Sequence, residues 1–253
     1  SFLYYADRVN QLPLGVVGVA IGTALLPLPS RQLRTGEIAA AANSMNRGLE
    51  VALLLTVPAS AALLVIAEPI VIVLFERGAF GSAISTATAQ ALMAYAVGIP
   101  AYVLIKVLAP GFFAREDTVT PVRIAILCVV LNIVLSLILI RYLAHAGIAL
   151  ATGISAWINA GLLAWVLHRR GHHSADRRLW SRIPRIVLAA GGMAAGLSGA
   201  MFLFGEIFVR DLELRIAALA LLIAFGMALY FGLAALLGAT RLSDLKDLLA
   251  RRR

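Results

Sequence analysis

Positions 121–142 read PVRIAILCVVLNIVLSLILIRY, and neither a lysine nor an acidic residue occurs in this stretch. A run of this length is close to what an α-helix needs to cross the hydrocarbon core of a bilayer. A second apolar run, 146–167, follows after only a few residues, Ala144-His145-Ala146-Gly147. So short a connection requires two helices to lie side by side and antiparallel. This pair of segments predicts an all-α integral membrane protein.

Apolar runs of similar length recur along the chain and predict about seven transmembrane helices, at 4–28, 48–75, 87–110, 121–142, 146–167, 184–205 and 214–238. The chain has 253 residues, of which 61% are hydrophobic and only 14% charged, and its mean hydropathy is +0.92. A soluble domain of this size needs more charge on its surface. Pro58 and Pro69 predict a kink or a break within the second span. The single cysteine, Cys128, cannot form an intrachain disulfide and is predicted to be a packing residue.

Basic residues are distributed unevenly between the loops. The net charge of +9 would suggest a nucleic-acid partner in a soluble protein, but here the Lys and Arg residues lie mainly between apolar runs, so no nucleic acid is expected. One set of loops, including 169–183 and the tail 239–253, carries most of the 22 basic residues, whereas the other side has only Arg77, Arg141, Arg210 and Arg215. The positive-inside rule therefore predicts a cytoplasmic C-terminus. The basic loop and the tail are expected to touch anionic lipid headgroups.

The head of the first span is unusually polar for a membrane helix. Arg8 follows Asp7, and Arg8 begins a series spaced 3, 4, 3 and 4 residues apart, which places its members on one helix face: Arg8, Gln11, Gly15, Gly18 and Gly22. An arginine in a membrane normally faces a cavity or a partner, because exposure to lipid costs about 2.5–3.5 kcal/mol on insertion scales. This face therefore predicts one wall of a water-filled cavity in which Arg8 can bind an anionic group such as a phosphate. The alternative is an Arg8 that extends to the interface and pairs with Asp7, with glycines that only permit close helix packing.

Other polar residues within the spans have two interpretations each. Lys106 either extends to the cytoplasmic interface or faces the cavity. Asn132, Ser136, Thr152 and Asn159 either form a cation site or make interhelical hydrogen bonds. Gly192 and Gly196 predict close contact between helices. No pair of carboxylates and no His/Cys spacing predicts a catalytic or metal centre, so an enzyme, for example one acting on polyprenyl phosphates, is not expected.

Several ordered motifs resemble the MurJ/MviN family of bacterial lipid II flippases, which belongs to the multidrug/oligosaccharidyl-lipid/polysaccharide exporter superfamily. These motifs occupy residues 4–8, 12–23, 25–27, 77–80, 94–100, 106–114 and 117–122, and the resemblance fades after about Leu167. Proteins of that family have fourteen helices, arranged as two six-helix lobes and two further helices. The resemblance implies that this chain supplies helices eight to fourteen. Residues 1–168 would form the C-terminal lobe, 169–183 a cytoplasmic loop, 184–238 the two additional helices and 239–253 the tail. The N-terminal lobe of the same protein would be the missing partner, and an opening Ser1 without an initiator Met fits this expectation.

The function that the resemblance implies is transport of lipid II, a lipid-linked peptidoglycan precursor, from the inner to the outer leaflet of the bacterial inner membrane. The transport would proceed by alternating access and would serve peptidoglycan biosynthesis, and through it cell wall biogenesis and cell shape. Arg8 matches a family cavity cation, and Asp7, Gln11 and Lys106 would lie beside it. No cofactor is implied, although Asn132 and Thr152 match a monovalent cation site of some members, with Ser136 where the pattern has Asp. Pro29 also departs from the family pattern. The alternatives are export of another lipid-linked glycan, a cation-coupled small-molecule exporter, and a membrane scaffold that transports nothing.

Overall fold

The computed structural model describes residues 2–24, 32, 35–76, 81–209 and 211–239, and in these residues the chain is helical with no strands. The helices are α1 (Phe2–Ala24), α3 (Ile38–Phe75), α4 (Ser82–Ala96), α5 (Ile99–Leu108), α6 (Pro110–Phe113), α7 (Val119–Arg169), α8 (Arg177–Phe204), the short 3-10 helix η1 (Gly205–Val209) and α9 (Leu212–Leu236). The predicted all-α fold is confirmed. The expectations for Pro29, for residues 77–80 and for most of the basic tail fall outside the described residues.

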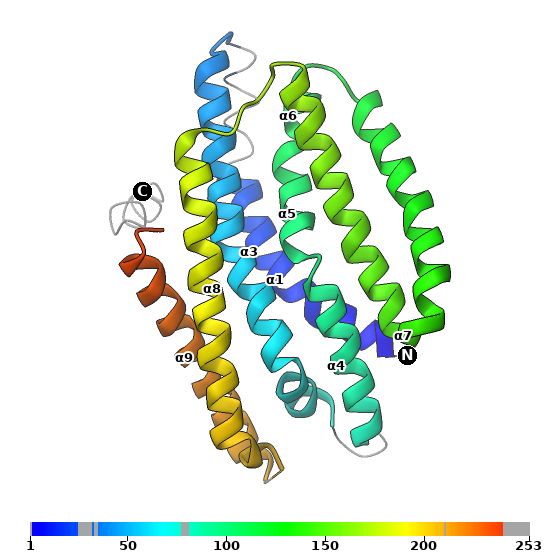
Figure 1. The fold of residues 1–253 in the computed structure, drawn as a ribbon, viewed down its shortest axis with the longest axis vertical. Coiled ribbons are helices and arrows are strands. Elements are labelled where there is room, and N and C mark those ends of the chain that lie inside the picture. The colour runs from blue at the N-terminus through cyan, green and yellow to red at the C-terminus, as the bar shows by residue number, and fades with distance from the viewer. Residues whose placement is uncertain (1, 25–31, 33–34, 77–80, 210, 240–253) are drawn as a thin grey trace.

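Helix α3 is the central element of the bundle (Figure 1). It packs against α1, α4, α5, α8 and α9. One apolar cluster joins α3 to α1 and α4, a second joins α3 to α8 and α9, and a third connects α3 with α5 and α7. The two predicted additional helices, α8 and α9, therefore attach to α3 mainly through α8. Helix α1 packs on α3 and α5 at the side of the bundle away from α8 and α9 (Figure 1).

The predicted hairpin between the fourth and fifth spans is confirmed. Ala144 has a non-helical backbone (φ 48°, ψ −131°) and divides α7 into two arms, which run antiparallel in Figure 1. A side chain at Gly147 would place its Cβ 2.5 Å from the Leu139 carbonyl oxygen, so this close approach of the two arms requires glycine. The His145 ring nitrogen Nε2 lies 2.7 Å from the Ala87 carbonyl oxygen and ties the turn to α4.

Five helical stretches of the described chain are long and apolar enough to cross a membrane: 38–75, 82–113, 119–169, 177–208 and 212–236. The predicted number of about seven is not confirmed by this count, because the broken helix α7 is counted once and α1 is not among the five. The first arm of α7 shows the character of a lipid-facing helix. Ile126 is 59% exposed and Leu137 66% exposed, and such a continuous apolar surface is stable in lipid rather than in water.

The predicted span 87–110 lies within the stretch 82–113, which is long and apolar enough to cross a membrane, but the helix in it is interrupted. Helix α4 ends at Ala96 and α5 begins at Ile99, because Pro100 lacks an N–H and its ring clashes with the carbonyl four residues earlier. That carbonyl, Ala96 O, instead accepts a hydrogen bond of 2.7 Å from the Ser60 hydroxyl. The neighbouring Val97 carbonyl accepts one of 2.9 Å from the Trp157 indole N–H. Side chains of α3 and α7 thus satisfy the backbone groups at the break, as a membrane interior requires.

The break predicted in the second span is confirmed near one of its two prolines. Ile66 has a non-helical backbone (φ −109°, ψ 20°) inside α3, three residues before Pro69. Pro58 lies in regular helix, so it causes no comparable break. The predicted contact at Gly192 and Gly196 is also confirmed. A Cβ at these positions would lie 2.7 Å from Leu233 and 2.4 Å from Leu229, both on α9.

Gly98→Ala is expected to destabilise the protein by about 1–3 kcal/mol, which is the usual cost of forcing extra volume into packed structure. The new Cβ would lie 2.9 Å from the Cα of Gly153, and backbone cannot move aside as a side chain can. The measurement is the thermal unfolding midpoint of the full-length protein in detergent. Gly191→Ala is the matched control, since no heavy atom lies within 4 Å of a Cβ there. Equal midpoints for the two variants would contradict the assignment of a tight α5–α7 contact.

Candidate functional site

The open face of α1 is the candidate site, because α1 has one packed side and one exposed side. Ala6, Val9 and Asn10 are buried against the bundle. Arg8, Gln11 and Gly15 are exposed and Gly18 is half-buried, as the spacing of the predicted face requires. Gly22 falls within α1, but its surroundings are outside what the structure describes.

Local hydrogen bonds set the positions of the charged groups at the head of this face. The Arg8 guanidinium donates to the Tyr4 hydroxyl through Nε at 3.3 Å and through one terminal nitrogen at 3.1 Å, and its carbon lies 5.1 Å from the Tyr4 ring centroid. Asp7 accepts a hydrogen bond of 2.5 Å from the Gln11 amide. Arg8 is therefore held by Tyr4, one turn earlier, and not by Asp7 as the interfacial alternative expected. Arg8 is exposed, and among the described residues its guanidinium makes no other hydrogen bond.

Lys106 reaches the same face from a neighbouring helix. Its ammonium lies 3.2 Å from the position that a Cβ on Gly18 would take, so the glycine provides the room for the lysine. Arg8 and Gly18 are ten residues apart, which is about 15 Å along a helix axis. The Arg8 side chain also points toward Tyr4, away from Gly18, as long helical side chains usually do. Two cations therefore lie along α1 at two different depths.

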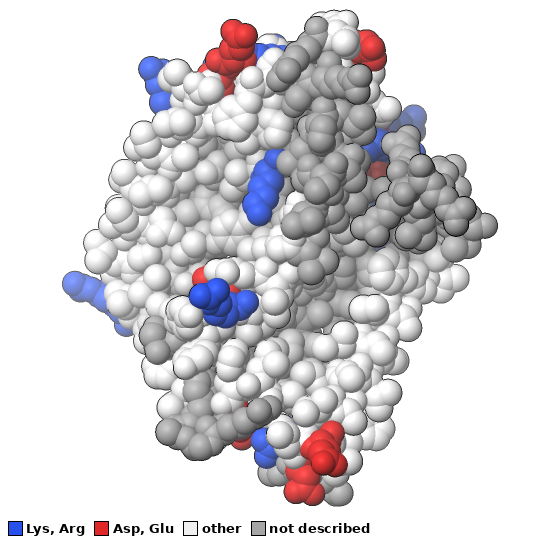
Figure 2. All heavy atoms as spheres, turned by 180° about the vertical axis from the view of Figure 1, so that it is seen from behind, with Lys and Arg blue, Asp and Glu red and all other residues white. Residues whose placement is uncertain are grey.

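Among the described residues, few other charged side chains lie on this face of the molecule (Figure 2). Helix α1 lies behind α3 and α5 in Figure 1 and so faces the viewer in Figure 2. Figure 2 shows basic side chains in the middle of that face, one of them with an acidic side chain directly beside it, on a surface that is otherwise mostly uncharged where it is described. A shallow cavity of about 510 Å³ opens beside Arg8 and Gln11 and is closed on the far side by Leu74 and Phe75 of α3. Among the described residues that line this cavity there is no carboxylate, although Asp7 lies next to Arg8 in the sequence.

No contact among the described residues supports the possible cation site. The Thr152 hydroxyl donates to the Ile148 carbonyl of its own helix at 2.9 Å. Within the described chain no hydrogen bond joins Asn132 to Thr152, and the buried Ser136 hydroxyl has no partner. Nor do three or more His, Cys, Asp or Glu side chains converge anywhere in that part of the chain. The cation site at Asn132 and Thr152 stays a prediction without geometric support.

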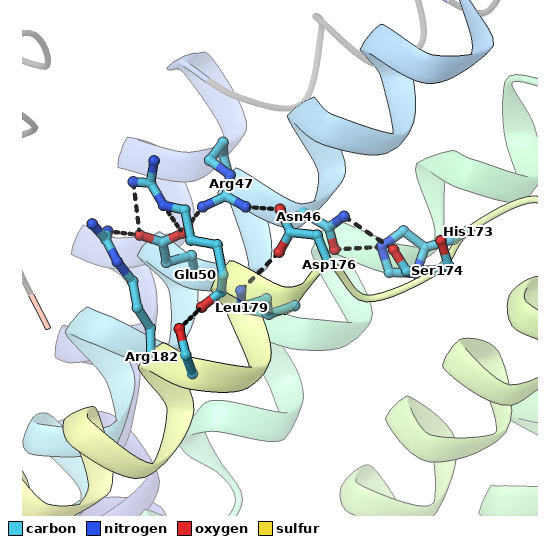
Figure 3. Close-up of polar contacts among 10 residues, drawn as sticks. Asn46, Arg47, Glu50, His173, Ser174, Asp176, Leu179 and Arg182 are labelled. Carbon is cyan, nitrogen blue, oxygen red and sulfur yellow. Dashed lines mark hydrogen bonds and ion pairs between the residues drawn. The ribbon is translucent and has the colours of Figure 1, made fainter.

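A buried ionic cluster centred on Glu50 is the polar feature that the sequence did not predict (Figure 3). Glu50 is 5% exposed and contacts three guanidinium groups: Arg47 on its own helix and Arg178 and Arg182 on α8. Arg47 also pairs with Asp176, whose other oxygen caps the N-terminus of α8 by accepting from Leu179 N at 2.7 Å. The cluster fastens α8 to α3. Arg178 and Arg182 belong to the basic region that was expected to contact lipid headgroups, and both of them bind Glu50.

Two smaller polar clusters order the segments around the 170–176 loop. The His173 ring donates to the Asn46 amide oxygen at 2.9 Å, and the Asn46 amide donates to the Ser174 carbonyl at 3.0 Å (Figure 3). On the other side of the loop, Asp117 caps the first arm of α7. Hydrogen bonds from Thr120 and from Arg170 lower the pKa of Asp117 to about 2. These contacts join the 170–176 loop to α3 and the two ends of α7 to each other.

Stability is expected to decrease below about pH 6.5 because of His173. Burial lowers the pKa of His173 below its usual 6.5, with nearby His168 acting in the same direction and Asp176 opposing. The unfolded chain therefore takes up a proton on this histidine more readily than the folded chain does. Neutral His173 thus makes its full contribution to the free energy of unfolding above pH 6.5, and this contribution is lost as the pH falls toward the pKa of the folded state. The measurement is the thermal midpoint of the full-length protein between pH 8 and pH 5.5. His173→Gln should reduce the acid-induced decrease, and an unchanged decrease in that variant would assign the effect to other groups.

The apolar helices, the lipid-facing arm of α7 and the open charged face of α1 together define a multi-pass α-helical membrane protein. Comparison with known proteins narrows this class. The chain belongs to the MurJ family: the family model described as "Lipid II flippase MurJ" matches residues 1–220.

Individual relatives agree with this assignment. The chain is 48% identical over 248 residues to the "Probable lipid II flippase MurJ" of Rhizobium meliloti (strain 1021), covering 97% of this chain and 46% of that protein. It is 37% identical over 247 residues to the protein of the same description from Vibrio cholerae serotype O1, covering 97% of this chain and 47% of that protein. A solved structure described as "Lipid II flippase MurJ, inward closed conformation" superposes with a TM-score of 0.75 at 24% identity, over 93% of this chain and 46% of that one. The chain thus spans about half the length of the relatives it matches.

Proposed function

We propose that the protein containing this chain is a lipid II flippase that moves its substrate across the membrane by alternating access, and that α1 forms part of the substrate pathway. The observation that carries the proposal is the open face of α1, with Arg8 exposed at one depth and the Lys106 ammonium over Gly18 at another. Cationic side chains on the open face of an otherwise apolar membrane bundle need an anionic partner. The diphosphate of a lipid-linked precursor supplies that charge, and the names of the relatives give the same substrate.

The separation of the two cations suggests how each contributes. A single diphosphate cannot span about 15 Å of helix axis, so Arg8 and Lys106 would contact the headgroup in turn. The planar guanidinium of Arg8 suits bidentate binding of phosphate, whereas the Lys106 ammonium acts as a point charge. Unequal contacts in the inward and outward states would bias the equilibrium between those states when substrate is bound. The second wall of the pathway would come from the other lobe of the whole protein.

The membrane and the orientation belong to the same proposal. The uneven distribution of Lys and Arg supports a cytoplasmic C-terminus, and a peptidoglycan precursor supports the bacterial inner membrane. In this orientation the N-terminus of α1, and with it Arg8, lies toward the outer leaflet, while Lys106 lies deeper toward the cytoplasm. No chemical step on the substrate is proposed, and the protein acts as a transporter.

The test is reconstitution of the full-length protein in vesicles that contain lipid II in the inner leaflet. Lipid II is expected to become accessible at the outer face faster than in protein-free vesicles of the same composition. A second set of vesicles carries a different lipid-linked glycan with the same diphosphate. Transport of the second glycan but not of lipid II would establish another exporter of this superfamily, and transport of neither would overturn the proposal.

A further inference from the structure

A groove on the opposite side of α5 contains all the tryptophans of the chain. The chain has three, and Trp157, Trp165 and Trp180 all line one groove of about 500 Å³ between α3, α5, the second arm of α7 and α8. Leu104 and Leu108 of α5 form part of its wall. Lys106 lies between these two leucines in sequence and reaches α1 instead, so the groove and the α1 face open on different sides of α5.

The groove changes from apolar to polar along its length. Its wall within the bundle consists of leucine, isoleucine, alanine and glycine residues together with Trp157, and its end at the 170–176 loop carries His168, His173 and Ser174. Trp165 and Trp180 lie near this end and are 53% and 67% exposed. Tryptophans with one apolar and one polar surrounding are typical of the boundary between lipid tails and headgroups. The groove therefore matches the change in polarity along a phospholipid molecule.

One arginine at the polar end remains available for a ligand. The Arg169 guanidinium lies 4.9 Å from the ring centroid of Trp165, which fixes it at the mouth of the groove, and Arg169 is exposed. Two neighbouring arginines are occupied, since Arg170 pairs with Asp117 and Arg182 pairs with Glu50. Among the described residues no carboxylate pairs with Arg169, so its positive charge at the end of the groove is uncompensated.

We propose that this groove is a binding site for an anionic phospholipid of the phosphatidylglycerol class. One acyl chain lies along the apolar wall, and the phosphate diester, which carries a single negative charge, lies against Arg169. His168 and Ser174 are placed to donate hydrogen bonds to its remaining oxygens or to its glycerol. The positive charge of Arg169 complements a phosphate diester, whereas a zwitterionic headgroup would bring a further positive charge to the same place.

The experiment is native mass spectrometry of the full-length protein in detergent, titrated with phosphatidylglycerol or with phosphatidylcholine of the same acyl chains. The wild type is expected to retain phosphatidylglycerol preferentially. Arg169→Gln should weaken that preference about fivefold, as expected for one charge near an anionic headgroup. Arg141→Gln, at the other end of the first arm of α7, is the matched control and should leave the preference unchanged.

A second variant tests the apolar part of the site independently of charge. Gly161 lies in the groove wall with no heavy atom within 4 Å of a Cβ position, so Gly161→Leu places its side chain in the groove without a clash. This variant should reduce retention of both lipids, while Gly199→Leu, at an equally open glycine outside the groove, should not. Equal retention of the two lipids by the wild type, or equal retention by the two leucine variants, would overturn the proposal. Lipid II displacing the phospholipid from the wild type but not from Gly161→Leu would also overturn it, since the groove would then belong to the transported substrate.

Discussion

Arg8→Ala in the full-length protein is expected to abolish lipid II translocation. Arg8 is exposed on α1, and its only polar contacts among the described residues are with Tyr4, so the remaining guanidinium donors are available to the substrate. Hydrogen bonds to charged groups contribute about 1.5–3 kcal/mol each, and the loss of two corresponds to a decrease of at least a hundredfold in affinity for a diphosphate. The measurement is the amount of lipid II at the outer face that is accessible to a membrane-impermeant probe.

Two comparisons separate a substrate contact from a structural role. Arg8→Lys keeps the charge but loses bidentate geometry, so it should also fail if the guanidinium binds phosphate directly. Arg141→Ala removes an exposed arginine from the lipid-facing arm of α7 and should transport normally. If Arg8→Ala maintained a normal level of outer-leaflet lipid II while remaining folded, α1 would not line the substrate pathway.

The structural features that could be predicted from the sequence are those that residues close together in the chain determine. The hairpin in α7 was predictable because only three residues separate the two apolar runs, which leaves the chain no other geometry. The exposed face of α1 was predictable because the spacing of Arg8, Gln11, Gly15 and Gly18 matches the helical period. The break between α4 and α5 was visible in Pro100, but the predicted span ignored it. Its stabilising partners, Ser60 and Trp157, come from distant helices and have no local signature.

The features that sequence could not give depend on contacts between remote residues. Nothing in the local pattern around Lys106 distinguishes an ammonium over Gly18 from one that extends to the interface, because the choice depends on how α5 packs on α1. The basic residues near the 169–183 loop presented the same problem. Their number predicted that the loop is cytoplasmic and contacts lipid headgroups. Arg178 and Arg182 instead bind Glu50, a residue of α3 more than a hundred positions away.

That ionic cluster makes Glu50→Gln the substitution with the largest expected effect on stability. The side chains of Glu50 and Arg182 are 6% and 8% exposed, so the substitution removes the charge of the carboxylate that this buried guanidinium contacts. Breaking a buried ion pair from one side typically costs about 3–5 kcal/mol. The thermal midpoint of the full-length protein in detergent should decrease accordingly. Glu68→Gln, an exposed glutamate of the same helix α3, should change it little.

A double variant identifies the physical cause of that loss. Replacing both partners also removes the buried guanidinium, and an apolar pair can be as stable as the buried ions that it replaces. Glu50→Gln combined with Arg182→Met is therefore expected to be more stable than Glu50→Gln alone, although Arg178 would still lose its contact with the Glu50 carboxylate and Arg47 would keep only Asp176. If the double variant were less stable than Glu50→Gln, Arg182 would stabilise the interface through its apolar stem. The attachment of α8 to α3 would then depend on packing and not on charge.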